Sequence, residues 1–324
     1  MSQEITVCYA SNDNYVGFLG ISVMSLCQNA EPEQKISIYV IDNKISEKGK
    51  KELISLQQSY NFSLTFLPFD ESLFDACLPP CKMNGIIWQE RSIFGRYLIP
   101  QLIPADKVLY LDCDVLIRHS LSELWKIDLD HNYIAGVPDF HIMKMSYLKQ
   151  CFGQDYDVHE YVNSGVLVMN SRLWREDRLL EKLMAYNQEN ATKLKCPDQD
   201  AINYVCRGRI KHLPERYNVR NYVYMPDLFA DSPRMEEIIN EGKDPIIRHF
   251  HPWQKNYFII HREEWINLAK KSPWQHLIPR DDPFLIAWAK NFLDYWLKHP
   301  LFFLQPRFYR RLKARGAKLL FLGI

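Results

Sequence analysis

The 324-residue chain has a formal net charge of +1, with 47% hydrophobic and 13% aromatic residues. This composition is that of an ordinary globular protein, long enough for one large α/β domain or one domain with an appendage. A near-neutral charge disfavours nucleic acid as a general partner. The chain starts directly with a strand pattern, and no apolar run is long enough to span a bilayer. We therefore expect neither a secretory signal nor a transmembrane helix.

The eight cysteines are scattered along the chain. Only Cys77 and Cys81 are close together, and no second pair of matching spacing follows them to complete a zinc site. Without a signal sequence, we expect the cysteines to be reduced and the protein to be cytoplasmic.

Strand and helix patterns alternate in the first part of the chain. Hydrophobic periodicity predicts strands at 5–9, 36–41 and 64–67, and helices at 18–28 and 46–60. This βαβαβ order is typical of a parallel sheet with helices on its faces, as in a Rossmann-like nucleotide-binding half. No Gly-x-Gly-x-x-Gly follows the first strand, which disfavours a nicotinamide dinucleotide.

The middle of the chain continues the alternation. The predicted elements are a helix at 90–98, strands at 108–111, 133–139 and 161–170, a helix at 171–189, a helix that begins at 197–200, and a last strand at 246–251. Several of these strands end in polar residues. Open α/β sheets bind their ligands at the carboxyl ends of the strands, so these residues are the first candidates for a site.

Two carboxylates, Asp112 and Asp114, follow the apolar strand 108–111. Alternate strand residues point to the same face, so both carboxylates face the same way and Cys113 faces the core. Two such charges repel each other and are costly to bury unpaired, which makes a divalent metal the expected partner. The alternative is a turn with two solvated carboxylates, because an isolated Asp-x-Asp is weak evidence.

A set of separated motifs resembles the retaining glycosyltransferases of family 8, the lipopolysaccharide galactosyl/glucosyltransferase type that includes glycogenin. The resemblance runs from the first strand to about Arg262. The motifs are Ala-Ser-Asn-Asp-Asn-Tyr at 10–15, Arg96, Leu-Tyr-Leu-Asp-Cys-Asp at 109–114, Asn-Ser-Gly-Val at 163–166, Asp-Gln-Asp at 198–200, and His249. Such a resemblance implies a Rossmann-like α/β fold of the GT-A type, with a mostly parallel mixed sheet.

The resemblance also implies a metal site and a UDP-sugar donor. Asp112, Asp114 and His249 would hold Mn²⁺ or Mg²⁺, which stabilises the charge of the leaving diphosphate as a Lewis acid. Lys255 would contact the diphosphate, and Arg96 would approach the donor. The predicted nucleotide pocket comprises Ala10, Ser11, Asn12, Asn14 and the backbone of Cys113.

Three positions depart from the family pattern. Asn12 replaces the acid that commonly contacts the base, and Pro252 replaces a glycine that follows the metal histidine. The usual Lys-Pro-Trp becomes Lys255-Asn256-Tyr257. Proline has no amide proton to offer a phosphate. The departures at 252 and 255–257 therefore weaken the assignment of Lys255 to the diphosphate, whereas the assignment of the metal ligands does not depend on them.

The family retains the anomeric configuration, and two routes could achieve this. Double displacement requires a nucleophile, for which Gln199 and Asp198 are the candidates. In front-face attack, which we favour because an amide is a poor nucleophile, Gln199 stabilises a cationic sugar. The residues expected to hold the sugar are Asp139, Asn163, Ser164, Asp198 and Gln199. For Asp200, helix capping or a buried hydrogen-bonding role is the better interpretation.

Two other functions remain to be tested. An aspartyl-nucleophile phosphatase also uses Asp-x-Asp after a strand, but its motif lies near the domain start and is followed by small polar residues. Here Val115 and Leu116 follow, and three strands precede. An inactive sugar-nucleotide-binding protein is the second alternative, against which the intact set of candidate ligands argues. No motif distinguishes galactose from glucose, and the acceptor, a lipopolysaccharide core or another lipid-linked glycan, is an expectation.

The last part of the chain has a different character, so we divide it into a catalytic domain at 1–279 and a segment at 280–324. Residues 307–318 contain six basic residues and no acid, and aromatic residues are frequent around them. A basic, aromatic, helical tail is suited to an anionic membrane surface. We therefore expect peripheral attachment to the inner face of the cell membrane, with a packed helix or an oligomer contact as the alternative.

Overall fold

The computed structural model describes residues 4–77, 82–83, 86–87, 91–140, 147–220, 223, 235–250 and 261–278. The strands are β1 Ile5–Asn12, β2 Ile36–Asn43, β3 Ser63–Pro68, β4 Lys82–Met83, β5 Ile86–Ile87, β6 Lys107–Leu111, β7 Val115–Ile117, β8 Ile134–Pro138, β9 Val162–Asn170, β10 Ile210–His212, β11 Val219–Arg220 and β12 Ile247–His249.

The α-helices are α1 Val16–Gln28, α2 Glu47–Ser55, α3 Gly95–Leu102, α4 Ser122–Lys126, α6 Tyr147–Phe152, α7 Ser171–Glu176, α8 Leu179–Asn190, α9 Pro197–Val205, α10 Met235–Lys243 and α11 Arg262–Ala269. Short 3-10 helices are η1 Leu56–Gln58, η2 Glu71–Cys77, η3 Arg91–Phe94, η4 Val158–Glu160, η5 Glu215–Tyr217 and η9 Gln275–Leu277.

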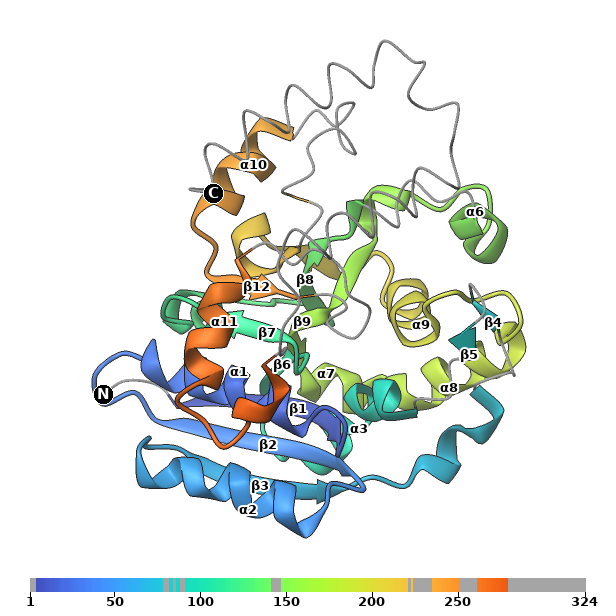
Figure 1. Cartoon of the computed structure of the whole chain (residues 1–324). Coiled ribbons are helices and arrows are strands. Elements are labelled where there is room, and N and C mark those ends of the chain that lie inside the picture. Colours follow the sequence, from blue (N-terminus) through green and yellow to red (C-terminus); the bar gives the residue numbers. More distant parts are fainter. Residues whose placement is uncertain are drawn as a thin grey trace, which may run out of the picture.

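A seven-stranded sheet in the order β10-β8-β9-β6-β1-β2-β3 forms the centre of the molecule (Figure 1). The pairs β1–β2, β2–β3, β1–β6 and β8–β10 are parallel, whereas β9 is antiparallel to both β6 and β8. The predicted mostly parallel mixed sheet is therefore confirmed. Because β9 runs against its neighbours, its first residues lie beside the carboxyl ends of β6 and β8.

Alternate residues of the central strands enter two separate cores, one on each face of the sheet. In β6, Leu109 and Leu111 pack in the core that contains α1, and Val108 and Tyr110 pack in the core that contains α3, α8 and α9. Covering both faces with helices is what the nearly continuous apolar pattern of the parallel strands requires.

A second, three-stranded sheet in the order β11-β12-β7 continues the chain beyond the acidic motif. Strand β7 pairs antiparallel with β12, and this register places His249 opposite Val115. Strand β11 pairs parallel with β12, and Arg220 lies opposite His249. The small sheet thus carries two residues from late in the chain to the edge where β6 ends.

Three predicted helices differ from the observed ones. The helix expected at 46–60 is α2, which ends at Ser55 and is followed by the 3-10 helix η1. The helix expected at 171–189 is broken between α7 and α8, where Arg178 has a φ of +52° and the Asp177 carboxylate accepts hydrogen bonds from Tyr133 and Arg209. The helix expected at 90–98 begins as the 3-10 helix η3 and continues as α3 to Leu102. Side-chain contacts of Asp177 with distant residues accompany the break between α7 and α8. At η1 and η3 a change to 3-10 winding limits the α-helix.

The segment that follows α11 packs directly on α1. A Cβ atom at Gly20 would lie 2.0 Å from the Trp274 ring, and one at Gly17 would lie 2.3 Å from Leu277. Trp265 also contacts Phe18, with ring centroids 5.6 Å apart. The two glycines therefore let residues 261–278 approach the backbone of the first helix closely.

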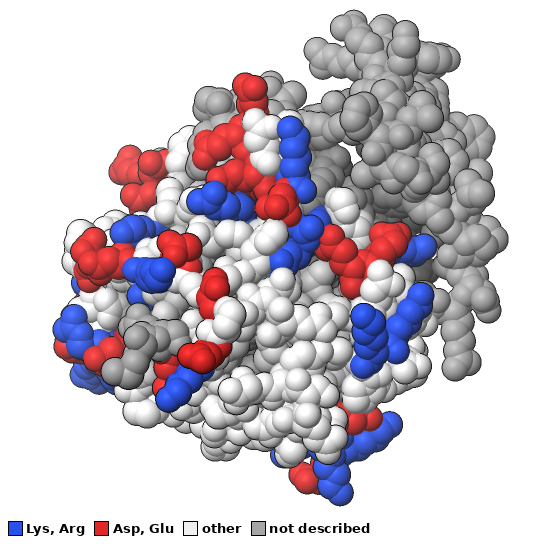
Figure 2. Space-filling model, turned by 90° about the vertical axis from the view of Figure 1, so that its left-hand side faces the viewer, with Lys and Arg blue, Asp and Glu red and all other residues white. Residues whose placement is uncertain are grey.

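Charged side chains of both signs are interspersed over the described surface in Figure 2, with no broad basic region among the described residues on that face. None of the described helices is both long enough and apolar enough to cross a membrane. The tail at 280–324 lies outside the described residues.

Candidate functional site

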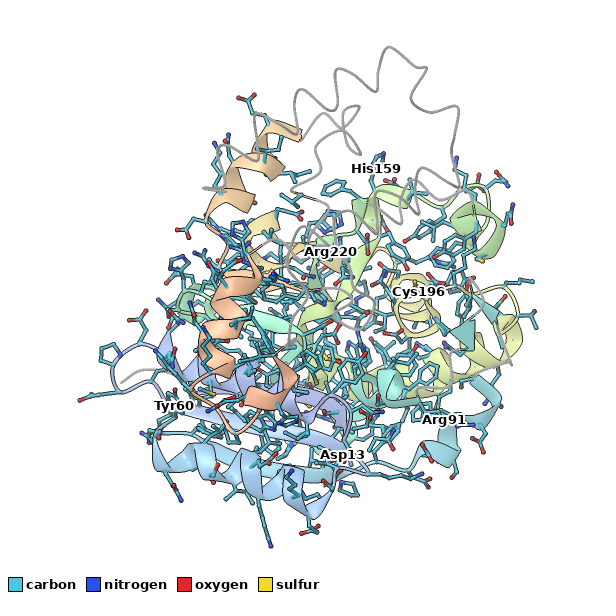
Figure 3. All side chains as sticks on the ribbon, viewed as in Figure 1. Asp13, Tyr60, Arg91, His159, Cys196 and Arg220 are labelled. Carbon is cyan, nitrogen blue, oxygen red and sulfur yellow. The ribbon has the colours of Figure 1, made fainter. Side chains whose placement is uncertain are left out.

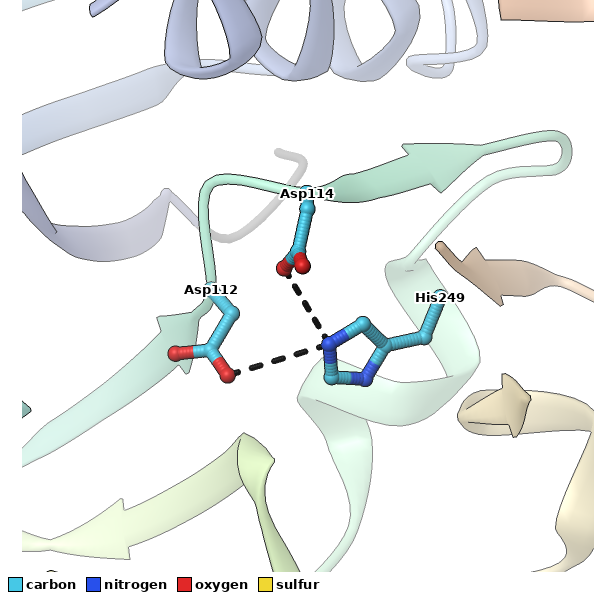
Figure 4. Close-up of side chains that lie close together, drawn as sticks. All are labelled: Asp112, Asp114 and His249. Atoms are coloured by element: carbon cyan, nitrogen blue, oxygen red, sulfur yellow. Dashed lines mark hydrogen bonds and ion pairs between the residues drawn. The ribbon is translucent and has the colours of Figure 1, made fainter. Parts of the chain in front are cut away.

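Three side chains from distant parts of the chain converge at the carboxyl end of β6 (Figure 4). Asp112, Asp114 and His249 each offer a ligand atom, and these atoms lie within 4.8 Å of one another. His249 Nε2 is 3.1 Å from Asp114 Oδ1 and 3.8 Å from Asp112 Oδ2. The structure thus brings together the predicted metal ligands. The cause differs from the predicted strand alternation, because residues 112–114 form a turn between β6 and β7.

The orientation of the His249 ring is set from its other side. Its Nδ1 lies 2.8 Å from Asn218 Oδ1, and both side chains are buried. An amide oxygen accepts, so Nδ1 carries a proton, and Nε2, which faces the two carboxylates, is the ring atom that can bind a metal when it is deprotonated. Burial lowers the pKa of His249, but the charges of Asp114 and Asp112 outweigh this effect and raise it above its ordinary value.

The two oxygens of Asp112 have different partners. Oδ1 accepts hydrogen bonds from Arg96 at 2.9 Å and from the Tyr110 hydroxyl at 2.7 Å, whereas Oδ2 faces His249. The Arg96 guanidinium also lies over the Tyr110 ring, 4.5 Å from its centroid. Hydrogen bonds of this kind fix one oxygen of a carboxylate and leave the other available to a metal.

Arg96 joins this carboxylate to the residues predicted to hold the sugar. It is 4% exposed and also contacts Asp198 Oδ2 at 3.2 Å and the backbone and hydroxyl oxygens of Ser164. Burial opposes its charge, but Asp112, Tyr110 and Asp198 together raise its pKa. Burial also raises the pKa of Asp198, against the effect of Arg96. The structure therefore places Arg96 among protein acceptors, and its contact with the donor stays a prediction.

A glycine makes room for the converging side chains. A Cβ atom on Gly165 would lie 2.4 Å from His249 Cε1 and 2.5 Å from Asp112 Oδ2. Two hard oxygen donors and a correctly oriented imidazole around such a cradle fit a divalent cation of the Mn²⁺ or Mg²⁺ type. A cation would also relieve the repulsion between the two carboxylates.

Beside this cluster, the Gln199 amide is held at both ends. Its Oε1 accepts from Asn163 Nδ2 at 2.9 Å and from the Ser164 amide at 3.0 Å. Its Nε2 donates to Asp139 Oδ2 and to the Tyr161 hydroxyl, both at 3.1 Å. The structure thus brings together the residues predicted to hold the sugar, at the end of β8 and at the starts of β9 and α9.

Arg220, which no sequence motif indicates, completes this group. Its guanidinium donates to Asp139 Oδ2 at 2.5 Å, and both side chains are at least 90% buried. In the view of Figure 3, Arg220 stands in the middle of the picture, apart from Asp13 and Tyr60. Asn218 was missed as well. The one available signal was Asn218-Val219-Arg220, two polar residues around a valine, which is too short to identify a strand.

The predicted nucleotide residues lie at the end of β1 and in the turn before α1. Asn12 Oδ1 accepts from the backbone amides of Asn14 and Tyr15, so this side chain shapes the turn. Cys113 is buried and donates to the Ala10 carbonyl, and burial raises its thiol pKa well above the ordinary value. Its predicted core packing is confirmed. Nucleotide contacts at these positions stay predictions.

Two further predictions concern Asp200 and Lys255. Asp200 is buried, and it accepts hydrogen bonds from the hydroxyls of Tyr147 and Tyr161 and from the amides of Lys195 and Cys196. This confirms the buried hydrogen-bonding role. Lys255, together with residues 252, 256 and 257, lies outside the described residues.

The comparisons with known proteins agree with this geometry. The family model described as "Glycosyl transferase family 8" matches residues 6–261. A putative glycosyltransferase of Haemophilus influenzae is 28% identical over 67% of this chain, which spans 64% of that protein. The lipopolysaccharide 1,2-glucosyltransferase of Escherichia coli K12 is 24% identical, with 92% of this chain and 87% of the relative covered.

Solved structures show the same fold. The crystal structure of the galactosyltransferase LgtC, in complex with donor and acceptor sugar analogs, superimposes with a TM-score of 0.73 at 24% sequence identity. The match covers 85% of this chain and 100% of LgtC. With a family model that covers most of the chain and a shared GT-A-like fold, the chain belongs to glycosyl transferase family 8.

Proposed function

We propose that this family 8 glycosyltransferase is a metal-dependent, retaining hexosyltransferase that moves galactose or glucose from a UDP-sugar to a glycan acceptor. The observation that carries this proposal is the convergence of Asp112, Asp114 and His249 within 4.8 Å, next to the hydrogen-bonded group around Gln199. A diphosphate held by the first group would place its sugar beside the second.

Each part of the site would have a distinct task. Asp112, Asp114 and His249 would hold Mn²⁺ or Mg²⁺, which as a Lewis acid offsets charge on the leaving diphosphate. Asp139 and Asn163 would hold sugar hydroxyls. Catalysis would then depend on these fixed polar groups, which are directed at the positions where the sugar and the leaving diphosphate develop charge.

The hydrogen bonds of Asp198 and Gln199 favour front-face attack over double displacement. Asp198 Oδ2 is engaged by Arg96 and by the Ser164 hydroxyl at 3.1 Å, which reduces its nucleophilicity. Gln199 is an amide whose oxygen already accepts two hydrogen bonds. Stabilisation of a cationic sugar by Gln199 requires no covalent bond and suits this arrangement. Comparing the anomeric configuration of donor and product by NMR tests retention.

The experiment that tests the function is a donor screen. UDP release from UDP-galactose and UDP-glucose is measured with Mn²⁺, with Mg²⁺ and after chelation. We expect metal-dependent release from one donor, reduced at least roughly 100-fold in Asp112→Asn, because a loss of about 3 kcal/mol of charge stabilisation corresponds to that factor. Asp155→Asn, at an exposed carboxylate, is the matched control and should retain full activity.

Other outcomes have defined meanings. Metal-dependent binding of UDP-sugars without release would identify an inactive sugar-nucleotide-binding protein. Release of phosphate from a phosphomonoester, with no turnover of any UDP-sugar, would support the phosphatase alternative.

We also propose that the acceptor is a lipopolysaccharide core or another lipid-linked glycan at the cytoplasmic face of the membrane. The name of the Escherichia coli relative and the basic composition of residues 307–318 support this. Deleting residues 283–324 should move the protein from the membrane fraction to the soluble one. Unchanged partition would refute membrane attachment through the tail.

A further inference from the structure

Asn218 connects the candidate metal ligands to the residues predicted to hold the sugar. It is 0% exposed and lies between η5 and β11. Its Oδ1 is 2.8 Å from His249 Nδ1, and its Nδ2 donates to Asn163 Oδ1 at 2.8 Å. A single buried amide therefore bonds one residue of each group.

The orientation of this amide follows from a backbone group. The Gly165 amide donates to Asn163 Oδ1 at 3.0 Å, and a backbone N–H can only donate. Asn163 Oδ1 is therefore an acceptor, so Asn218 must present its NH₂ group to it. The oxygen of Asn218 then faces His249, which leaves the Nε2 lone pair of that ring for a metal.

The hydrogen bond at the other end of the Asn163 amide independently indicates the same orientation. The Ser164 amide donates to Gln199 Oε1 at 3.0 Å, which makes this oxygen an acceptor. Asn163 therefore presents its Nδ2 to Gln199 at 2.9 Å and its Oδ1 to Asn218. Two backbone amides of β9 thus define the amide orientation of three side chains.

We propose that Asn218 is a positioning residue that holds His249 in its metal-binding orientation and couples the metal centre to the sugar-binding Asn163. This inference rests on the proposed function, because it assigns a role within the same site. Loss of the Asn218 side chain frees the ring of His249 to rotate and removes one of the two donors to Asn163 Oδ1. Both metal affinity and donor binding then weaken.

Two substitutions separate these effects. Asn218→Ala removes both hydrogen bonds, and we expect the Mn²⁺ dissociation constant, measured by electron paramagnetic resonance without substrate, to rise roughly 10- to 100-fold. Asn218→Asp keeps an acceptor for His249 Nδ1 but places a carboxylate oxygen against Asn163 Oδ1. We expect it to bind Mn²⁺ like the wild type while its KM for the donor rises.

Asn187→Ala is the matched control for the loss of a buried amide. Asn187 is also 0% exposed, accepts from the Tyr97 hydroxyl and donates to the Pro197 carbonyl. Its replacement should lower the unfolding midpoint but leave Mn²⁺ affinity unchanged. If Asn218→Ala behaved like this control, the inference would be wrong, because a purely structural role predicts that result.

Failure of the inference differs from failure of the proposed function. An active wild type whose Asn218→Ala and Asn218→Asp variants keep Mn²⁺ affinity and donor KM would overturn the inference alone. A wild type that binds Mn²⁺ but turns over no UDP-sugar would overturn the proposed function, and the Mn²⁺ affinities of the variants would still decide the role of Asn218.

Discussion

At the scale of single residues, the site depends on which atom of each side chain meets which partner. Asp112 uses Oδ1 for Arg96 and Tyr110 and directs Oδ2 to His249. Gln199 accepts through its oxygen and donates through its nitrogen. Such buried polar groups are costly to leave unsatisfied, so each partner constrains the next.

Gly165→Ala should greatly weaken metal binding. The added methyl group would lie within 2.5 Å of both His249 Cε1 and Asp112 Oδ2, so the ligands must separate. We expect weak Mn²⁺ affinity by electron paramagnetic resonance, with the free energy of unfolding lowered by about 1–3 kcal/mol. Gly153→Ala is the control for a strained alanine far from the ligands: its φ of +98° should lower the stability as well, but with no atom within 4 Å of the added Cβ it should leave Mn²⁺ affinity unchanged. Normal Mn²⁺ affinity in Gly165→Ala would show that the ligands are not held as described.

Arg220→Met should destabilise the fold and impair use of the donor. It leaves the buried Asp139 carboxylate without its cation, which costs about 3–5 kcal/mol of unfolding free energy. Urea unfolding and kcat/KM for the UDP-sugar measure the two effects. The more exposed pair of Arg209 with Asp177 provides the control, since Arg209→Met should cost no more than about 1 kcal/mol. Equal losses in the two variants would contradict a special role for Arg220.

At the scale of elements, the site is built where the two sheets meet. Strand β6 ends at Leu111, the turn 112–114 carries the carboxylates, and β7 then pairs with β12. This pairing delivers His249 opposite Val115, so backbone hydrogen bonds rather than side-chain contacts alone position the third ligand. Helix α1 lies directly after the turn predicted to contact the nucleotide.

Trp274→Ala should destabilise the packing of residues 261–278 on α1. The indole is 1% exposed and lies against Gly17 and Gly20, so its loss leaves a cavity that the glycines cannot fill. We expect a loss of about 3–5 kcal/mol in the free energy of unfolding, measured with urea. Leu73→Ala, at a residue that is 48% exposed, should change it by less than about 0.5 kcal/mol. A similar small change for Trp274→Ala would show that this contact contributes little.

At the scale of the whole molecule, metal binding should stabilise the fold, because the ligands come from positions 112, 114 and 249 and converge only when the chain is folded. Mn²⁺ at 100 times its dissociation constant should raise the free energy of unfolding by about 2.7 kcal/mol, as measured by urea unfolding with and without chelator. Asp114→Asn should remove most of this increment. An equal increment in that variant would place the stabilising metal elsewhere.

Much of the architecture was predictable from local pattern. Apolar patterns located six of the seven strands of the central sheet but missed the short edge strand β10, and the βαβαβ order indicated the parallel half. The antiparallel direction of β9 was not predictable, because a short buried run has the same pattern in either direction. The break at Arg178 was missed because tertiary contacts of Asp177 cause it.

The sequence by itself determined which residue types form the site, because Asp112, Asp114, His249 and Gln199 stand in motifs that resemble a known family. The tertiary structure alone decided how these residues are connected. Asn218 and Arg220 entered the site through the pairing of β11 with β12, a contact between segments that no local periodicity encodes. The hydrogen bonds that orient His249 and Gln199 start from the amide groups of Gly165 and Ser164 in β9. These amides point towards the site only when β9 has paired in the sheet.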